Sequence, residues 1–423
     1  MSFLKNSVSG KILGGLSNYL KIDVPYFVKG GFWLGVGYAG SALLRLLQIV
    51  ILARVIDRQE YGVYQFVLVS IAVVAVFSLP GMDGAVVRSV ANGYYSSFVS
   101  GTKAKLKWAL IGSLVLFGMA MFFKFFQPRP FWHIFIFVAL LFPCYTGFSG
   151  IPAYYRGKEK FRTAALYDLL VAGVSTFAIF VALFLEKSVF AVIISLMIFN
   201  ILVYFFVYFK TCKQISSYPV DRAVVREGIH YTVIGALSYL TPYADKFIIA
   251  FVVGFEGLAV YAVAVSLLLN LSIGSSLIST LLLPKLSRAK PHHAERIKGL
   301  FWLACFCIAG LVLAVILLTP WLLPFLFSVK YVESVRYAQI ALVSLVFLLP
   351  SSILVTFFRA RNRVKFLYVY ALGMGIMNIV LLGIGVPLLG IFGAVLSKVV
   401  LSFLGCAFLA VWFFATTRIK SSE

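Results

Sequence analysis

The chain has 423 residues, of which 62% are hydrophobic and only 12% are charged, and its formal net charge is +23. A soluble domain usually carries about a quarter charged residues, because its surface faces water. No polar stretch here is long enough to build such a domain, so most of the surface must face lipid. The five cysteines and four histidines show neither CxxC nor HExxH spacing, so we expect no disulfide framework, no metal site and no cofactor.

Residues 1–26 form a cytoplasmic N-terminal segment in which Lys5, Lys11 and Lys21 interrupt the apolar positions. No continuous apolar core is followed by a small-residue cleavage site, so we do not expect a cleavable signal. Several apolar residues recur at helical spacing, which indicates a short helix lying at the membrane surface.

From residue 27 onward, the chain is a series of apolar stretches of about 20 residues, the length that a helix needs to cross a bilayer. Short links between them make neighbouring helices antiparallel. We therefore predict an all-α integral membrane protein with about twelve transmembrane helices. The predicted spans are Phe27–Val55, Tyr61–Leu79, Leu106–Phe126, Phe131–Gly150, Ala164–Leu185, Val189–Phe209, Tyr231–Val253, Val260–Leu283, Phe301–Leu318, Tyr337–Phe358, Phe366–Val386 and Phe392–Phe414.

The basic residues alternate between the two sides of this arrangement. One side carries 27 Lys and Arg residues and the other carries 7. Because basic loops stay in the cytoplasm, both termini are predicted to be cytoplasmic. The basic loops would contact anionic lipid headgroups, so the net charge requires no nucleic-acid partner.

The two halves of the chain resemble each other. Tyr154–Lys160 and Phe357–Arg363 share a pattern of two aromatic residues, arginine, a small residue and then basic and polar residues. Tyr61–Tyr64 likewise matches Leu258–Tyr261 at a similar offset. This indicates a parallel repeat of two six-helix lobes, with the cleft of an alternating-access transporter between them. The predicted parts are the N-terminal lobe 27–210, a basic cytoplasmic linker 211–230, the C-terminal lobe 231–415 and a cytoplasmic tail 416–423.

Arg45 lies deep in the first predicted span. A charged side chain at mid-membrane costs about 2.5–3.5 kcal/mol and usually marks a functional site. Tyr38, Ser41 and Gln48 share a helix face with Arg45, and such a polar stripe should face a wet interior rather than lipid. We predict that this stripe binds substrate, with a structural ion pair at Arg45 as the alternative.

Asp245 and Lys246 lie together in the seventh predicted span, where Pro242 should bend the helix. Adjacent helical residues point about 100° apart, so these two need not pair with each other. We expect Asp245 to meet Arg45 across the cleft, either as a static ion pair or as part of transport.

Lys398 lies in the outer half of the twelfth span, where its side chain would either extend to the outer headgroups or bind substrate. Asp83 and Asp168 are predicted near the membrane surface, where a charge costs little. Asn200 and Asn378 lie mid-span, where interhelical hydrogen bonding is the alternative to a functional role. These four residues are secondary site candidates.

Several segments resemble a known family. They are Leu46–Arg54 followed by Glu60–Tyr64, then Asp245–Ile249, and Leu389–Ala394. Together with the length and topology, they resemble Wzx-type polysaccharide-unit flippases of the multidrug/oligosaccharidyl-lipid/polysaccharide exporter superfamily. The resemblance implies a carrier that moves an undecaprenyl-diphosphate-linked oligosaccharide, such as an O-antigen unit, to the outer leaflet of the bacterial inner membrane. It also implies that the protein acts together with a polysaccharide polymerase and other assembly proteins of lipopolysaccharide biosynthesis.

On this resemblance, Arg45, Lys246 and Lys398 would bind the diphosphate together with Tyr38 and Gln48. Arg45 and Asp245 stand where this family commonly keeps charged or polar residues. Because Asp245 is the one acid deep in the predicted core, we expect it to couple transport to a proton or sodium gradient. The chain lacks the signature and the fourteen-helix count of lipid II flippases, and its N-terminal extension is longer than usual.

Two other functions remain open. A multidrug-type cation antiporter of the same superfamily would favour acidic residues in its cavity, whereas this chain places three basic residues there. A membrane polysaccharide polymerase or ligase would carry a large outer loop, but the longest outer link, around Phe327–Arg336, has only about ten residues. We therefore expect a transporter rather than an enzyme.

Overall fold

The structure, a computed structural model, describes residues 24–127, 129–215, 219, 221–275, 278–279, 282, 294–361 and 363–419. The predicted surface helix within residues 1–26 lies almost entirely outside this range. Within it, every regular element is a helix. The first eight helices are α2 (Val24–Val55), α3 (Arg58–Val74), α4 (Met82–Ala91), α5 (Ser97–Phe125), α6 (Trp132–Gly147), α7 (Ile151–Gly157), α8 (Phe161–Leu185) and α9 (Val189–Cys212). The others are α10 (Val224–Val252), α11 (Phe255–Leu271), α13 (Ala294–Phe327), α14 (Ser334–Ala360) and α15 (Val364–Ile419).

Ten helices in the described residues are long and apolar enough to cross a bilayer, which confirms a multi-pass, all-helical membrane protein. The helix α10 is not among the ten, and it carries Asp245 and Lys246 in its apolar part. The number twelve and the cytoplasmic position of the termini remain predictions.

The long helix α15 folds back on itself at Gly390, where φ is 60° and ψ is −134°. The Ser397 hydroxyl donates to the Leu381 carbonyl at 3.0 Å across this bend. At Gly393 an added Cβ would lie 1.9 Å from the Gly385 oxygen, so the two arms touch through glycine backbone. A positive φ and this close approach both favour glycine. The bend lies between the two spans that the sequence predicts here, Phe366–Val386 and Phe392–Phe414.

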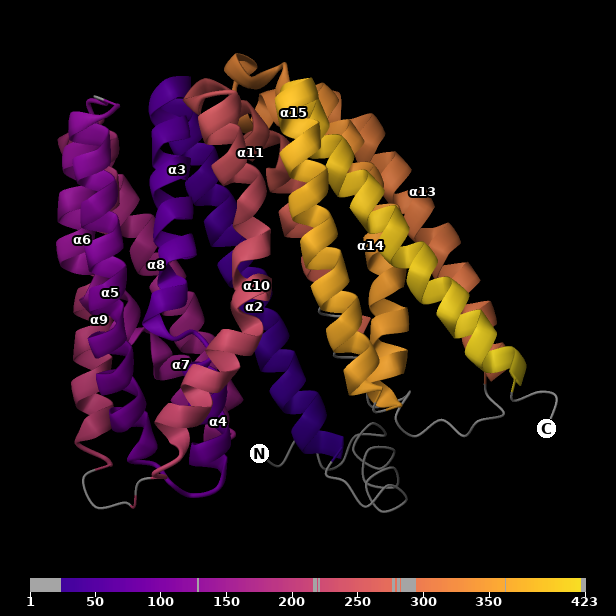
Figure 1. Cartoon of the computed structure of the whole chain (residues 1–423), viewed down its shortest axis with the longest axis horizontal. Coiled ribbons are helices and arrows are strands. Elements are labelled where there is room, and N and C mark those ends of the chain that lie inside the picture. Colours follow the sequence, from indigo (N-terminus) through magenta and orange to yellow (C-terminus); the bar gives the residue numbers. More distant parts are fainter. Residues whose placement is uncertain are drawn as a thin grey trace, which may run out of the picture.

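The helices pack in two sets (Figure 1). In one set α2 packs on α8, α5 on α6 and α8 on α9; in the other α13 and α15 pack on α14, and α10 packs on α15. The sets meet where α3 contacts α10 and α11, and where α4 contacts α10. At the α3–α11 contact, a Cβ on Gly62 would lie 1.9 Å from the Phe255 oxygen, so only glycine permits this approach. The lobe boundaries at residues 210 and 231 remain predictions.

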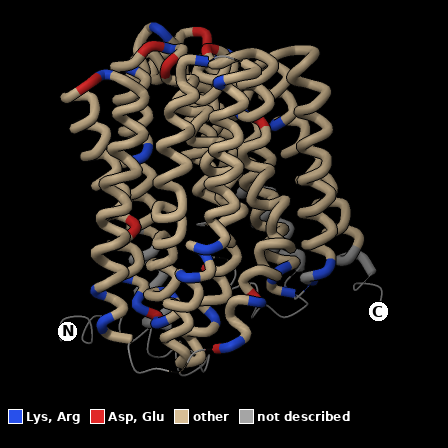
Figure 2. The backbone as a smooth tube through the Cα atoms, turned by 60° about the vertical axis from the view of Figure 1, so that its left-hand side comes forward, with Lys and Arg blue, Asp and Glu red and all other residues tan. Residues whose placement is uncertain are grey.

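Charged residues gather at the two ends of the bundle (Figure 2). Lys and Arg are most crowded at the end where α2 begins and α15 ends, here called the basic end. The other end is called the opposite end, and there α3, α9 and α11 begin. A few charged positions lie between the ends, and they are the candidates for function.

Candidate functional site: charged clusters within the bundle

A buried ion pair joins α10 to α15. Asp245 is 3% exposed, and its Oδ2 lies 2.7 Å from the Lys398 Nζ. The Tyr261 hydroxyl donates to the same oxygen at 2.5 Å, and the Lys246 backbone N–H donates to Oδ1 at 2.7 Å. The carboxylate therefore has a partner on each oxygen. The expectation that Asp245 meets Arg45 is wrong, because the faces of α10 and α15 that pack together bring Lys398 to it instead.

Lys398 thus points inward, and the alternative in which it extends to the outer headgroups is also wrong. Its side chain is only 21% exposed. A buried carboxylate without a partner would be strongly unfavourable, so the nearest ammonium is drawn to it rather than to the membrane surface.

Lys246 connects α10 to α3, across the junction of the two helix sets. Its Nζ donates to the Gln65 Oε1 at 3.1 Å, and the Gln65 amide donates to the Tyr61 hydroxyl at 2.8 Å. We call the six residues Tyr61, Gln65, Asp245, Lys246, Tyr261 and Lys398 the α10 cluster. Two ammonium groups and one carboxylate give this cluster a formal charge of +1.

Sequence reasoning missed Tyr61, Gln65 and Tyr261 as members of this cluster. The repeat did single out two of them, since Tyr61–Tyr64 matches Leu258–Tyr261. The signal in the sequence was therefore a pair of related tyrosine segments, and only their contact with α10 was not visible.

Arg45 lies in the middle of the α2 span and is exposed. Within the described part of the chain, its guanidinium makes no hydrogen bond or ion pair. Its electrostatic neighbours are Tyr145 of α6, Asp168 of α8 and Tyr204 of α9. Arg45 therefore interacts electrostatically with its own helix set, while its hydrogen-bond donors have no partner among the described residues.

The other three residues of the predicted stripe differ in exposure and in hydrogen bonding. Tyr38 is 45% exposed, whereas Ser41 is buried and its hydroxyl has no partner among the described residues. The Gln48 amide donates to the Ala172 carbonyl at 3.1 Å and to the Thr176 hydroxyl at 2.9 Å. The Gln48 nitrogen is therefore used in the α2–α8 contact, and its role in binding substrate remains a prediction.

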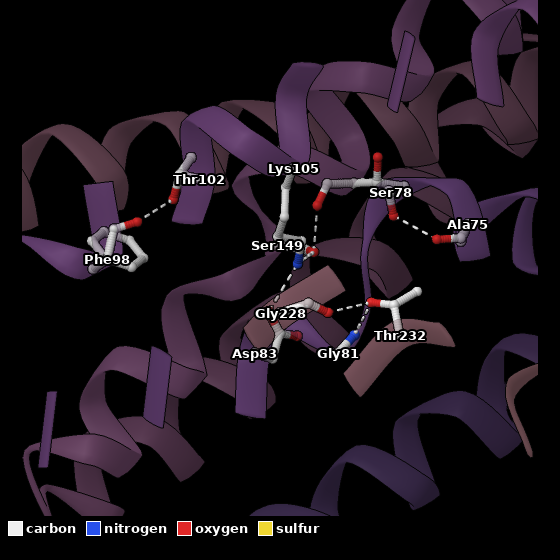
Figure 3. A network of polar contacts seen from close by, with 11 residues as sticks. Ala75, Ser78, Gly81, Asp83, Phe98, Thr102, Lys105, Ser149, Gly228 and Thr232 are labelled. Atoms are coloured by element: carbon white, nitrogen blue, oxygen red, sulfur yellow. Dashed lines mark hydrogen bonds and ion pairs between the residues drawn. The ribbon is translucent and has the colours of Figure 1, made fainter. Parts of the chain in front are cut away.

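Asp168 and Asp83 are both paired. Asp168 accepts from Arg156 at 2.9 Å. At the basic end, the Lys105 side chain is 5% exposed and its Nζ lies 2.9 Å from Asp83 and 3.2 Å from the Ser149 hydroxyl (Figure 3). A cavity of about 360 Å³ lies beside this network and is lined in part by Asp83, Ser149 and Arg156.

The two asparagines make interhelical hydrogen bonds. The Asn200 amide donates to the Ser175 hydroxyl of α8 at 2.9 Å. The Asn378 amide of α15 donates to the Thr241 carbonyl at 3.3 Å, beside Pro242 in α10. Both residues therefore connect neighbouring helices, which is the more ordinary of the two roles considered for them.

No group of three His, Cys, Asp or Glu residues able to hold a metal ion occurs in the described ranges. The chemistry that these clusters offer is the binding and exchange of charge. Three basic groups at membrane depth would favour an anion over a cation.

Residues 27–290 match the model of a family described as polysaccharide biosynthesis protein. A Shigella flexneri protein described as a candidate O-antigen transporter is 22% identical over 294 residues, which cover 62% of this chain and 67% of that protein. An inward-facing multidrug resistance MATE family transporter of the MOP superfamily superposes with a TM-score of 0.67 at 15% identity, covering 89% of this chain and 96% of that one. The lipid II flippase MurJ in an inward closed conformation also gives 0.67 at 15% identity, covering 92% and 90%. At these identities, the solved structures show a shared fold.

Proposed function

Because the chain belongs to the polysaccharide biosynthesis protein family, we propose that it is a flippase for a lipid-linked oligosaccharide. Transport rather than catalysis is supported by the Shigella flexneri relative, which is described as a candidate O-antigen transporter, and by the fold shared with the flippase MurJ. The proposed substrate is an undecaprenyl-diphosphate-linked repeat unit of a surface polysaccharide, such as an O-antigen unit. It would move from the cytoplasmic to the outer leaflet of the bacterial inner membrane and then pass to a polymerase and other assembly proteins.

The observation that carries this proposal is that the guanidinium of Arg45 has no hydrogen-bond or ion-pair partner among the described residues. An exposed cation at mid-span is costly unless it gains a partner during the functional cycle. A diphosphate matches it, because guanidinium binds phosphate oxygens through two parallel hydrogen bonds. Asp168 nearby is already neutralised by Arg156, so it does not compete fully for Arg45.

The α10 cluster would act together with Arg45. Its formal charge of +1 adds to the attraction for a diphosphate, and Lys246 bridges the two helix sets through Gln65. The lipid tail can remain in the bilayer while the charged head passes between the sets. A substrate phosphate that takes Lys246 from Gln65 would loosen this bridge and favour the alternating-access movement.

Arg45→Ala tests the binding role. We expect export of surface polysaccharide to stop, and lipid-linked repeat units to accumulate on the cytoplasmic side, while the protein is still present in the membrane. Arg45→Lys should restore part of the export, because lysine keeps the charge but loses the paired hydrogen bonds. Lys107→Ala, which removes an exposed charge from the basic end, is the control. Normal export by Arg45→Ala at a normal protein level would refute the proposal.

Coupling to a proton or sodium gradient would involve Asp245, the carboxylate of the α10 cluster. Asp245 would release Lys398 when a cation or proton neutralises it. We expect Asp245→Asn to stop gradient-driven transport in membrane vesicles but to leave binding of the lipid-linked substrate largely intact. Gradient-driven transport at the normal rate would exclude this role for Asp245.

A further inference from the structure

We propose that the cavity between the first turns of α3, α6, α9 and α11 is a second binding site, and that it takes the sugar part of the glycan. This opposite-end pocket has a volume of about 360 Å³, within the range of about 300–1,000 Å³ that is usual for small-molecule sites. Its lining includes neither Arg45 nor any residue of the α10 cluster. The choice of a saccharide as ligand rests on the proposed function.

Aromatic rings form the apolar part of the pocket. Phe131 is 6% exposed and packs edge-on against Phe255, with ring centroids 5.1 Å apart. The His133 ring lies 5.5 Å from the ring of Phe190. The partly exposed rings of Phe190 and Phe255 present apolar surface to the pocket, and the C–H face of a pyranose ring presents a matching apolar surface.

The polar part of the pocket comes from Gln59, Glu60, Arg129, His133 and Ser188. The Arg129 guanidinium lies 5.6 Å from the centre of the Phe255 ring, which holds it beside the pocket. The side chains of Gln59, Glu60 and His133 make no hydrogen bond or ion pair among the residues that the structure describes. Both donors and acceptors are thus available for hydroxyl groups.

The net charge of the pocket indicates a different kind of ligand from the one that Arg45 and the α10 cluster would bind. Glu60 and Arg129 cancel, so the formal charge is zero when His133 is neutral. A diphosphate requires an excess of positive charge, which Arg45 and the α10 cluster provide. A neutral ligand rich in hydroxyl groups fits the opposite-end pocket better.

The pocket lies between the two helix sets, so a ligand bound there would affect transport. Phe255 belongs to α11 in one helix set, whereas Gln59, Phe131 and Ser188 belong to the other. A saccharide bound here contacts both sets and stabilises the arrangement in which they touch at this end. A ligand that binds one arrangement only stabilises it by a free energy that grows with the ratio of ligand concentration to Kd, so exported glycan would slow the next opening of this end.

Binding is tested with the full-length protein in lipid nanodiscs. The probes are glucose, galactose, N-acetylglucosamine and rhamnose, each followed by saturation-transfer NMR, and inorganic pyrophosphate serves as the charged competitor. We expect at least one sugar to bind, and Gln59→Ala and Arg129→Ala each to weaken it about tenfold, the effect of losing one hydrogen bond to a polar or charged side chain. Lys187→Ala, which removes a charge at the same end outside the pocket, should leave sugar binding unchanged.

Absence of binding by all four sugars would overturn the inference, and so would sugar binding that neither pocket variant weakens. Displacement of the sugar by pyrophosphate would also overturn it, because the ligand would then share the charged site. If sugar binding fails while export still requires Arg45, only this inference falls. If the pocket binds sugar while Arg45→Ala exports normally, only the proposed function falls.

Discussion

At the scale of single residues, the charges inside the bundle differ in whether they are already satisfied. Asp245 and Lys398 are partners in a buried pair, and Lys246 is hydrogen-bonded to Gln65. Arg45 has none of these contacts in the described chain. This difference separates charges that maintain the resting structure from a charge that is available to a ligand, because a charge at membrane depth without a partner is unfavourable.

Removing Lys398 alone should therefore destabilise the protein. Lys398→Met leaves the Asp245 carboxylate buried without its ammonium partner, which costs about 3–5 kcal/mol when a buried pair is broken from one side. The double variant Asp245→Asn/Lys398→Met removes both charges and should recover most of the loss. Thermal unfolding in detergent measures both effects, with Lys187→Met as the control. An equally low Tm for the single and double variants would show that the ion pair is not the cause.

At the scale of helices, the corner where α2 ends and α3 begins contacts the corner where α13 ends and α14 begins. Arg54 donates to the carbonyls of Leu326, at 2.7 Å, and of Phe325. Arg58 donates to the Lys330 carbonyl, lies 3.5 Å from Glu333 and covers the ring of Tyr331. We call these contacts the opposite-end latch. They hold the two helix sets together at the end away from the chain termini.

Loss of the latch should open this end of the bundle. Each arginine makes charged hydrogen bonds worth about 1.5–3 kcal/mol, so each Arg→Ala variant should raise the open population about tenfold or more. The reporter is Ser334→Cys, a fully buried position next to the latch, in a background in which the five native cysteines are serine. Maleimide should label it faster when Arg54 or Arg58 is alanine.

The matched control for this measurement is Ser70→Cys, which is equally buried but lies in the body of α3. Its labelling should not change in the arginine variants. Equal acceleration at both cysteines would indicate general loosening of the protein, and no acceleration at Ser334→Cys would show that the latch does not hold this end closed.

At the scale of the whole molecule, the distribution of basic residues sets the orientation. The basic end carries the α7–α8 and α14–α15 links, whereas the opposite end carries the α8–α9 and α10–α11 links. Positively charged links remain in the cytoplasm during insertion. The opposite-end pocket and the latch are therefore predicted to face the outside.

Reporter fusions test this orientation directly. Alkaline phosphatase or green fluorescent protein fused after Lys290 or Arg361 should give a cytoplasmic signal, and fusions after Lys187 or Gly254 should give an external one. Lys290 lies outside the described residues, so its fusion also tests the link before α13. Reversal at any of these four sites would contradict the twelve-span topology.

The sequence by itself determined the long apolar helices, the membrane location and the asymmetry of basic residues, whereas the short helices α4 and α7 were not predicted. The predicted span Ala164–Leu185 corresponds to α8, Phe161–Leu185, and the predicted span Val189–Phe209 to α9, Val189–Cys212. These features are readable because the apolar length of a spanning helix is a local property that lipid imposes on each segment separately. The depth of Arg45 and Asp245 followed from the same count of residues.

Only the tertiary structure decided which charges meet. Asp245 pairs with Lys398 rather than with Arg45, Lys246 reaches Gln65 across 181 residues of sequence, and Gln48 is held by α8. Side chains far apart in sequence meet only when particular helix faces are packed together, and that packing depends on many contacts at once. The depth of a residue in its helix limits which side chains lie at the same level in the membrane. The rotation of each helix and the helices packed against it decide which of those side chains it contacts.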